Sequence, residues 1–143
     1  MPLTRCVLVA AMLGISAPAR AACTVDLAPV SFGIVDTQRQ TTGTGQVVVR
    51  CDSAATFAVG IAPGGSGGTR RMLGPDGIRL DYYLFSDAGR SVPWGDGQAI
   101  GPPVSASSDG TGQQRLTIYG AIPAQSGIPA GVYEDSLQVT LTF

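Results

Sequence analysis

The last residues of the chain alternate between apolar and polar side chains. The apolar positions are Leu137, Val139, Leu141 and Phe143, and the polar positions between them are Gln138, Thr140 and Thr142. Successive side chains of a strand point to opposite faces, so this pattern predicts a β-strand with one buried face. No turn or further strand follows in the sequence, and we expect the edge of this strand to be uncovered. An uncovered apolar edge pairs readily with another strand.

Similar patterns predict further strands earlier in the chain. The expected strands are 23–27, 46–51, 56–62, 78–86 and 113–119, followed by the last strand at 132–143. Segments rich in Gly, Pro or polar residues separate them, and no convincing helix appears beyond residue 21. Short strands between such turns indicate an all-β sandwich. Six strands are one fewer than the roughly seven of an immunoglobulin-like sandwich, so we predict an incomplete sandwich that is one strand short.

Residues 63–68 form a glycine-rich stretch between two of the expected strands. Glycine-rich loops can cradle phosphate, but that motif ends in Gly-Lys-Ser/Thr and opens a helix. Here no Lys follows, and Gly74-Pro75 interrupts the next segment. The stretch therefore indicates a flexible hairpin turn.

The first 21 residues have the features of an export signal. Arg5 supplies the positive charge, residues 6–15 form a short apolar core, and residues 19–21 read Ala-Arg-Ala. This predicts cleavage after Ala21, which divides the chain into a signal peptide, 1–21, and a β-sandwich domain, 22–143. The apolar run is too short to span a bilayer, and the mature chain offers no later candidate for a transmembrane segment.

Cleavage removes Cys6 and leaves Cys23 and Cys51. An even number of cysteines in an exported chain favours a disulfide, and both residues are in phase with the apolar side of their strands. We therefore expect Cys23 to be bonded to Cys51. The alternatives are two free buried thiols, or lipidation of Cys23, which is disfavoured by Arg20 three residues before it.

Composition argues against catalysis and against nucleic acid as a partner. The chain has no His, which excludes His-based triads and imidazole metal ligands. Without Arg5 and Arg20, nine basic residues become seven against ten acidic ones, a net charge of −3. No basic patch suggests nucleic acid. We expect no enzyme activity, no metal and no cofactor.

Carboxylate pairs could still hydrolyse glycosides. The most plausible members are Asp81, Asp96, Glu134 and Asp135. Glu134 and Asp135 are adjacent on a strand, so their side chains should point to opposite faces. They could not act together on one substrate.

Trp94 lies in a loop beside Asp96 and allows two interpretations. An exposed Trp could form a stacking surface for a sugar, with Asp96 as a polar neighbour. A single Trp beside Gly more often closes one end of a core or a turn.

Several segments, taken in order, resemble the spore coat protein U domain, which is shared by subunits of archaic, Csu-type chaperone–usher pili. They include the Cys23…Cys51 spacing, Leu80-Asp81-Tyr82-Tyr83-Leu84-Phe85, Trp94-Gly95-Asp96-Gly97 and the ending Pro129-Ala130-Gly131-Val132-Tyr133-Glu134-Asp135-Ser136. The resemblance covers nearly the whole mature chain. No single motif in it is specific, but the ordered set is.

This resemblance implies an immunoglobulin-like fold without its seventh strand. It implies three kinds of partner: a periplasmic pilus chaperone that fills the gap first, an outer-membrane usher, and other pilus subunits whose amino-terminal extensions replace the chaperone. The groove would be lined by Val25, Leu27, Leu137, Val139, Leu141 and Phe143. The protein would pass through the periplasm to the cell surface.

Shaft subunits of that family carry a donor extension before their first cysteine. Cleavage after Ala21 would leave only Ala22 before Cys23. We therefore expect a subunit that accepts a strand but has none to donate, which suits a tip or initiating position. Two other readings stay open: a stand-alone secreted coat or surface protein, and a carbohydrate-binding module that uses the Trp94 loop.

Overall fold

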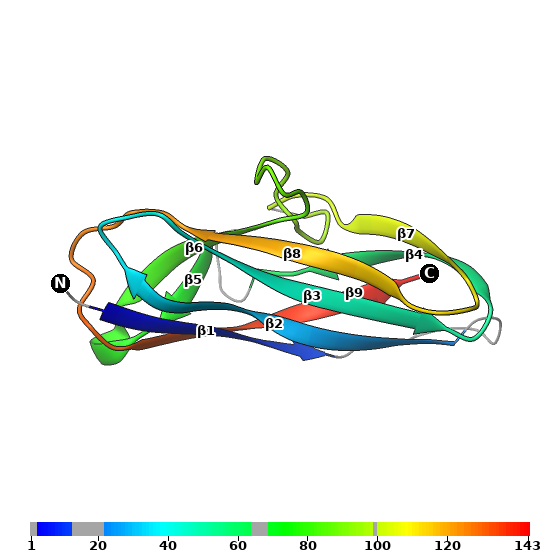
Figure 1. Ribbon diagram of the computed structural model, residues 1–143, viewed down its shortest axis with the longest axis horizontal. Coiled ribbons are helices and arrows are strands. Elements are labelled where there is room, and N and C mark those ends of the chain that lie inside the picture. Colours follow the sequence, from blue (N-terminus) through cyan, green and yellow to red (C-terminus); the bar gives the residue numbers. More distant parts are fainter. Residues whose placement is uncertain (1–2, 13–21, 64–68, 99) are drawn as a thin grey trace.

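Strands dominate the computed structural model, which describes residues 3–12, 22–63, 69–98 and 100–143 (Figure 1). The strands are β1 (Leu3–Met12), β2 (Cys23–Asp36), β3 (Thr41–Cys51), β4 (Ala54–Ile61), β5 (Arg70–Leu73), β6 (Arg79–Phe85), β7 (Val104–Asp109), β8 (Gln114–Ile122) and β9 (Val132–Thr142). A single turn of 3-10 helix, η1 (Pro75–Gly77), joins β5 to β6. The expected all-β class is confirmed.

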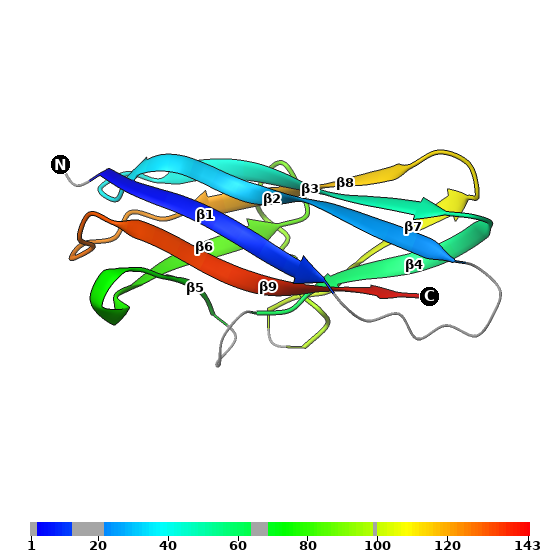
Figure 2. The same ribbon diagram turned by 90° about the horizontal axis from the view of Figure 1, so that it is seen from below.

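The strands pair in the order β1-β2-β3-β8-β6-β5-β9-β4-β7, and β1 also pairs with β9. The pairing of β1 with β9 is parallel, whereas the other strand pairings of the sheet are antiparallel. In Figure 2, β2 and β3 run along the upper layer, and β5 and β9 run along the lower one. The sheet is thus folded over on itself into an elongated two-layer sandwich, consistent with an immunoglobulin-like fold.

Apolar side chains from both layers meet between them. The largest fully buried side chains include Trp94, Tyr82, Tyr133, Phe57 and Ile61. Strand β6 illustrates the pattern, because Leu80, Tyr82 and Leu84 are buried while Arg79 and Tyr83 are exposed. The period of two therefore places alternate residues of β6 in the core.

The six expected strands are present, and the structure adds β1, β5 and β7. Strand β2 is longer than expected, because it continues past Pro29 and Gly33 to Asp36. The pairing of β2 with β3 shifts register between Ala28 and Ser31, around the proline that cannot donate a main-chain hydrogen bond. Gly33 has a φ of +65°, a conformation that glycine adopts without strain.

Strand β3 begins at Thr41, so the polar loop expected before it is confined to the turn after β2. The proposed hairpin tip at 64–68 and the proposed cleavage region at 13–21 lie outside the described residues. Within the expected signal peptide, the described segment Leu3–Met12 is β1.

Cys23 and Cys51 are bonded to each other, as the sequence predicted. They face each other in the pairing of β2 with β3, at the start of one strand and the end of the other. The bond therefore fixes one end of this hairpin.

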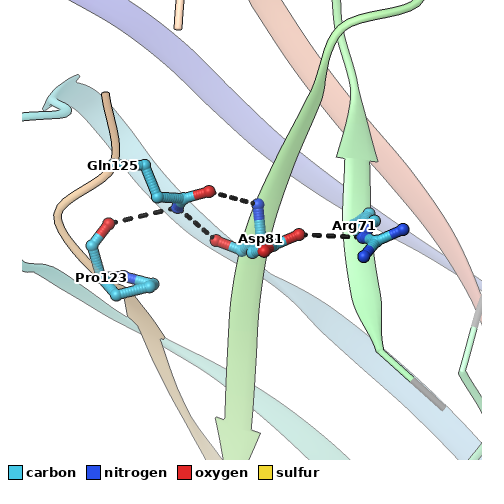
Figure 3. A network of polar contacts seen from close by, with 4 residues as sticks. All are labelled: Arg71, Asp81, Pro123 and Gln125. Carbon is cyan, nitrogen blue, oxygen red and sulfur yellow. Dashed lines mark hydrogen bonds and ion pairs between the residues drawn. The ribbon is translucent and has the colours of Figure 1, made fainter. Parts of the chain in front are cut away.

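Gln125 holds together the opposite end of the sandwich (Figure 3). Its side-chain oxygen accepts from the amide of Asp81 at 2.9 Å, and its side-chain nitrogen donates to the carbonyl of Asp81 at 2.9 Å and to that of Pro123 at 3.2 Å. The amide of Gln125 donates to the carbonyl of Thr37 at 2.8 Å. One residue of the β8–β9 connection thus pairs with β6 and with the turn after β2.

Candidate strand-acceptor groove

Strand β1 lies between β2 and β9 and joins the two layers along that side (Figure 2). Its residues 3–7 pair antiparallel with residues 31–36 of β2. Its residues 5–12 pair in parallel with residues 132–139 of β9. We call the space between β2 and β9 the acceptor groove, because a single strand completes the sandwich there.

This occupied groove corrects two expectations. The apolar run at residues 6–15 was interpreted only as the core of an export signal, yet residues 3–12 form β1. The edge of β9 was expected to be uncovered, yet β1 pairs with it from Val132 to Val139. Main-chain hydrogen bonds supply much of the affinity in strand addition and do not depend on side-chain type.

The wall of the groove on β9 alternates as the sequence predicted. Tyr133, Leu137, Val139 and Leu141 are buried, whereas Gln138 is exposed. Phe143, which the alternation placed on the same face, follows the last residue of β9 and is 46% exposed. The buried row therefore ends at Leu141.

The wall on β2 extends further than expected. Val25 and Leu27 are partly buried and pack against the core, as their parity suggested. Val30, Phe32 and Val35 are buried as well, and sequence analysis missed them because it ended this strand at Leu27. Val30 and Phe32 lie two residues apart, and this spacing is the signal in the sequence that could have extended the predicted strand.

Strand β1 covers only part of this wall. It pairs with residues 31–36, and no described strand pairs with the outer edge of β2 at residues 23–28. The groove is therefore longer than β1.

Asp135 places a carboxylate in the otherwise apolar row on β9. It lies two residues from both Tyr133 and Leu137, and it is half-buried while its neighbour Glu134 is exposed. The hydroxyl of Tyr82, on β6, donates a hydrogen bond to Asp135 Oδ2 at 2.5 Å. The expectation that Glu134 and Asp135 point to opposite faces is confirmed.

Arg70 lies close to this pair and is itself buried. Its terminal nitrogens donate to the carbonyls of Ala62 at 2.9 Å, Ile61 at 2.8 Å and Trp94 at 2.6 Å. Its Nε finds no hydrogen-bond partner among the described residues. The guanidinium thus ties the end of β4 and the Trp94 loop to β5, and its charge lies within electrostatic reach of Asp135.

Burial dominates the ionisation of the three groups. It raises the pKa of Asp135, although the Tyr82 hydrogen bond, the Ser136 amide and the Arg70 charge act in the opposite direction. It also raises the pKa of Tyr82, with a further rise from Asp135. Burial lowers the pKa of Arg70. Tyr82 therefore stays protonated and acts as the hydrogen-bond donor.

The sequence model of the Spore Coat Protein U domain family matches residues 9–140 of this chain. The chain belongs to this family. The match extends from within β1 to β9, so the strands on both sides of the acceptor groove belong to the family domain.

The chain is also similar to "Protein U" of Myxococcus xanthus, to which it is 30% identical over 111 residues. These residues make up 71% of this chain and 60% of Protein U. The chain thus spans about three fifths of the length of this relative.

Among solved structures, the domain is similar to a chain of the chaperone–tip adhesion subunit pre-assembly complex from archaic chaperone–usher Csu pili of Acinetobacter baumannii. The TM-score is 0.58 at 19% sequence identity, and the match covers 87% of this chain and 40% of that chain. This similarity shows a shared fold.

Trp94 does not provide the exposed surface that a sugar would need. It is 1% exposed, and its indole nitrogen donates to the carbonyl of Val59 at 2.8 Å. Asp96 instead accepts from the amide of Gln98 at 3.0 Å within the same loop. The interpretation of Trp94 and Asp96 as a surface-binding loop is therefore wrong, because the ring fills the core of this spore coat protein U domain.

The candidate carboxylates do not form a catalytic pair. Asp81 forms an ion pair with Arg71 at 3.0 Å (Figure 3), Glu134 points to solvent, and Asp135 points inward to Tyr82. Within the described ranges, no three potential metal ligands gather at one place. No described helix has the length and apolarity needed to cross a bilayer.

Proposed function

We propose that this protein is an exported structural subunit of a chaperone–usher pilus, completed by a β-strand that another chain inserts into the acceptor groove. The position of β1 is the observation that carries this proposal. Residues 3–12 fill the groove, and they belong to the segment that the sequence predicts to be a signal peptide. Cleavage after Ala21 would remove β1 and leave β2 and β9 without a strand between them.

The energetics favour replacement of the lost strand. Without β1, the groove edge of β9 would expose main-chain donors and acceptors beside Tyr133, Leu137 and Val139, which are buried when β1 is present. An incoming strand that buries four or five large apolar side chains would gain roughly 6–15 kcal/mol. Ordering the strand and losing its free motion offset part of this gain.

The family and the shared fold support the partners proposed here. A periplasmic chaperone would fill the groove after export. At an outer-membrane usher, the extension of another subunit would replace the chaperone and carry the protein to the cell surface. The fold shared with a chain from a complex of a chaperone and a tip adhesion subunit supports this reading. On this reading the protein has a structural role and is not an enzyme.

The predicted cleavage site also bears on position in the fibre. With Ala22 alone before Cys23, the mature protein would receive a strand but would have none of its own to donate. We propose a tip or initiating position on that basis. Amino-terminal sequencing of the exported protein measures how many residues precede Cys23.

The central experiment is export of the protein with and without its cognate chaperone. We expect the mature protein alone to self-associate or be degraded, because two strand edges and an apolar wall are uncovered. With the chaperone, size-exclusion chromatography should show a one-to-one complex. A stable, well-folded monomer without the chaperone would contradict the proposal.

A second candidate is a stand-alone spore coat or surface protein, which the family description and the similarity to Protein U favour. In that case the groove would be closed by part of the same chain. The same chromatography separates the two readings, because a self-closed protein stays monomeric without a partner.

A further inference from the structure

We infer that Asp135 selects the strand that enters the acceptor groove, by requiring a hydrogen-bonding or cationic residue at the register position opposite it. This inference rests on the proposed function, since it concerns which donor strand the groove accepts. It adds a chemical requirement at one position to the alternating apolar pattern that the rest of the wall requires.

Register places the incoming strand directly beside Asp135. In β1, position 8 pairs with Asp135, position 10 with Leu137 and position 12 with Val139. Neighbouring strands lie about 4.8 Å apart, and paired positions share a face of the sheet. A donor residue at position 8 of this register is therefore on the same face as the carboxylate.

The Asp135 carboxylate is held in place by groups that do not belong to the incoming strand. Tyr82, which is fully buried, donates to Oδ2, and the amide of Ser136 interacts with the same carboxylate. Arg70 uses its terminal nitrogens on three main-chain carbonyls, and no ion pair joins it to Asp135 among the described contacts. The carboxylate is thus a fixed, negatively polarised point in the wall, and no direct cationic contact neutralises it.

A large apolar residue at this position takes solvent from the carboxylate and offers no hydrogen bond in return, which is costly for a charged group. A Thr, Ser, Asn or Lys side chain supplies a donor, and a hydrogen bond to a charged group is among the stronger ones in proteins. The chain's own residue at this position is Leu8. A strand from another chain that carries such a donor opposite Asp135 would therefore bind more tightly than one that carries a leucine at this position of the register.

The first experiment uses the full chain, in which β1 serves as a built-in donor strand. All variants carry Cys6→Ser, so that only Cys23 and Cys51 can pair, and each is refolded and unfolded in urea. We compare Leu8→Lys with Leu8→Glu, in the native background and with Asp135→Asn. The Asn side chain keeps an oxygen that can accept from Tyr82 but carries no charge. In the native background, the Lys chain should have a folding equilibrium constant about tenfold or more above that of the Glu chain, and this ratio should shrink toward one with Asp135→Asn.

A second set of variants removes the Tyr82–Asp135 pair entirely. It combines Tyr82→Phe with Asp135→Leu, so that no buried hydroxyl is left without an acceptor. Leu8→Thr should stabilise the native background and destabilise the apolar one. Ala10→Thr, opposite Leu137, is the matched control and should destabilise both. An equal effect of Leu8→Thr in both backgrounds, or a Lys-to-Glu ratio that Asp135→Asn leaves unchanged, would overturn the inference. Neither measurement needs a chaperone, so failure here is distinct from failure of the proposed pilus role.

Discussion

At the scale of single residues, the cluster of Arg70, Tyr82 and Asp135 stands apart from the apolar core around it. Burying a carboxylate, a phenol and a guanidinium costs free energy unless hydrogen bonds compensate. Tyr82 and Asp135 compensate each other, and Arg70 is held by three main-chain carbonyls. The cluster therefore fixes where β5, β6 and β9 lie relative to one another, and its ionisation should affect stability.

We predict that Asp135→Asn changes the pH dependence of unfolding. The pKa of Asp135 is raised in the folded protein above its ordinary value of 3.8. The stability that protonated Asp135 contributes is therefore fully present below pH 3.8, and it is lost as the pH rises through the folded pKa. The melting temperature of the Asn variant, minus that of the native chain, should become more positive over that interval. A difference that stays constant with pH would contradict this assignment.

At the scale of elements, β9 uses both of its edges. One edge pairs with β5 at Glu134 and with β4 along residues 139–142, and the other pairs with β1 along residues 132–139. Val139 pairs on both edges and is buried, whereas Thr140 lies on the opposite face and is partly exposed. Substitutions at these two neighbours should therefore have very different effects.

We predict that Val139→Asp weakens strand capture far more than Thr140→Asp does. An uncompensated charge in the buried row should cost roughly 3–5 kcal/mol. The matched change at Thr140 should cost about 1 kcal/mol or less. Chaperone capture measured by co-purification reports the difference, and equal losses from the two changes would refute the assignment of Val139 to the groove.

The elements also explain what could be predicted from the sequence. Strands β6 and β9 carry large apolar side chains at every second position, so both were found from the sequence, and β9 was given the correct inward face at Leu137, Val139 and Leu141. Strand β7 pairs with β4 through Ser- and Ala-rich residues, and β5 has only four residues, so neither has enough apolar periodicity to be recognised. Strand β1 could not be found from periodicity, because main-chain pairing with β2 and β9 defines it. Asp135 was suspected only as a carboxylate, since nothing local in the sequence indicates Tyr82 as its partner.

At the scale of the whole molecule, one strand closes the sandwich along the side where β2 and β9 face each other. The Cys23–Cys51 bond lies at the end of β2 remote from the part that pairs with β1. It joins residues separated by 28 positions, so it restricts the unfolded chain and holds β2 to β3 independently of β1. The bond should keep the β2 wall in place when the groove is empty.

We predict that replacing both Cys23 and Cys51 by Ala lowers the free energy of unfolding by about 3–4 kcal/mol on the chain-entropy model. The loss of chaperone capture should be larger still for the protein without β1, because its β2 wall would then be held by β3 pairing alone. Urea unfolding of the full chain measures the first effect. Yield of the chaperone complex measures the second, and an undiminished yield would contradict the role given to the bond.

The pairing of one strand with two neighbours at once also has a mechanical consequence. A strand held like β1 is bonded along both of its edges, to β2 on one side and to β9 on the other. Tension applied along its length loads both ladders in shear, so that many main-chain hydrogen bonds resist together. Peeling it sideways from one end would break them one after another. A fibre joined by such strands would therefore hold best when it is pulled end to end, as flowing liquid pulls a cell attached to a surface.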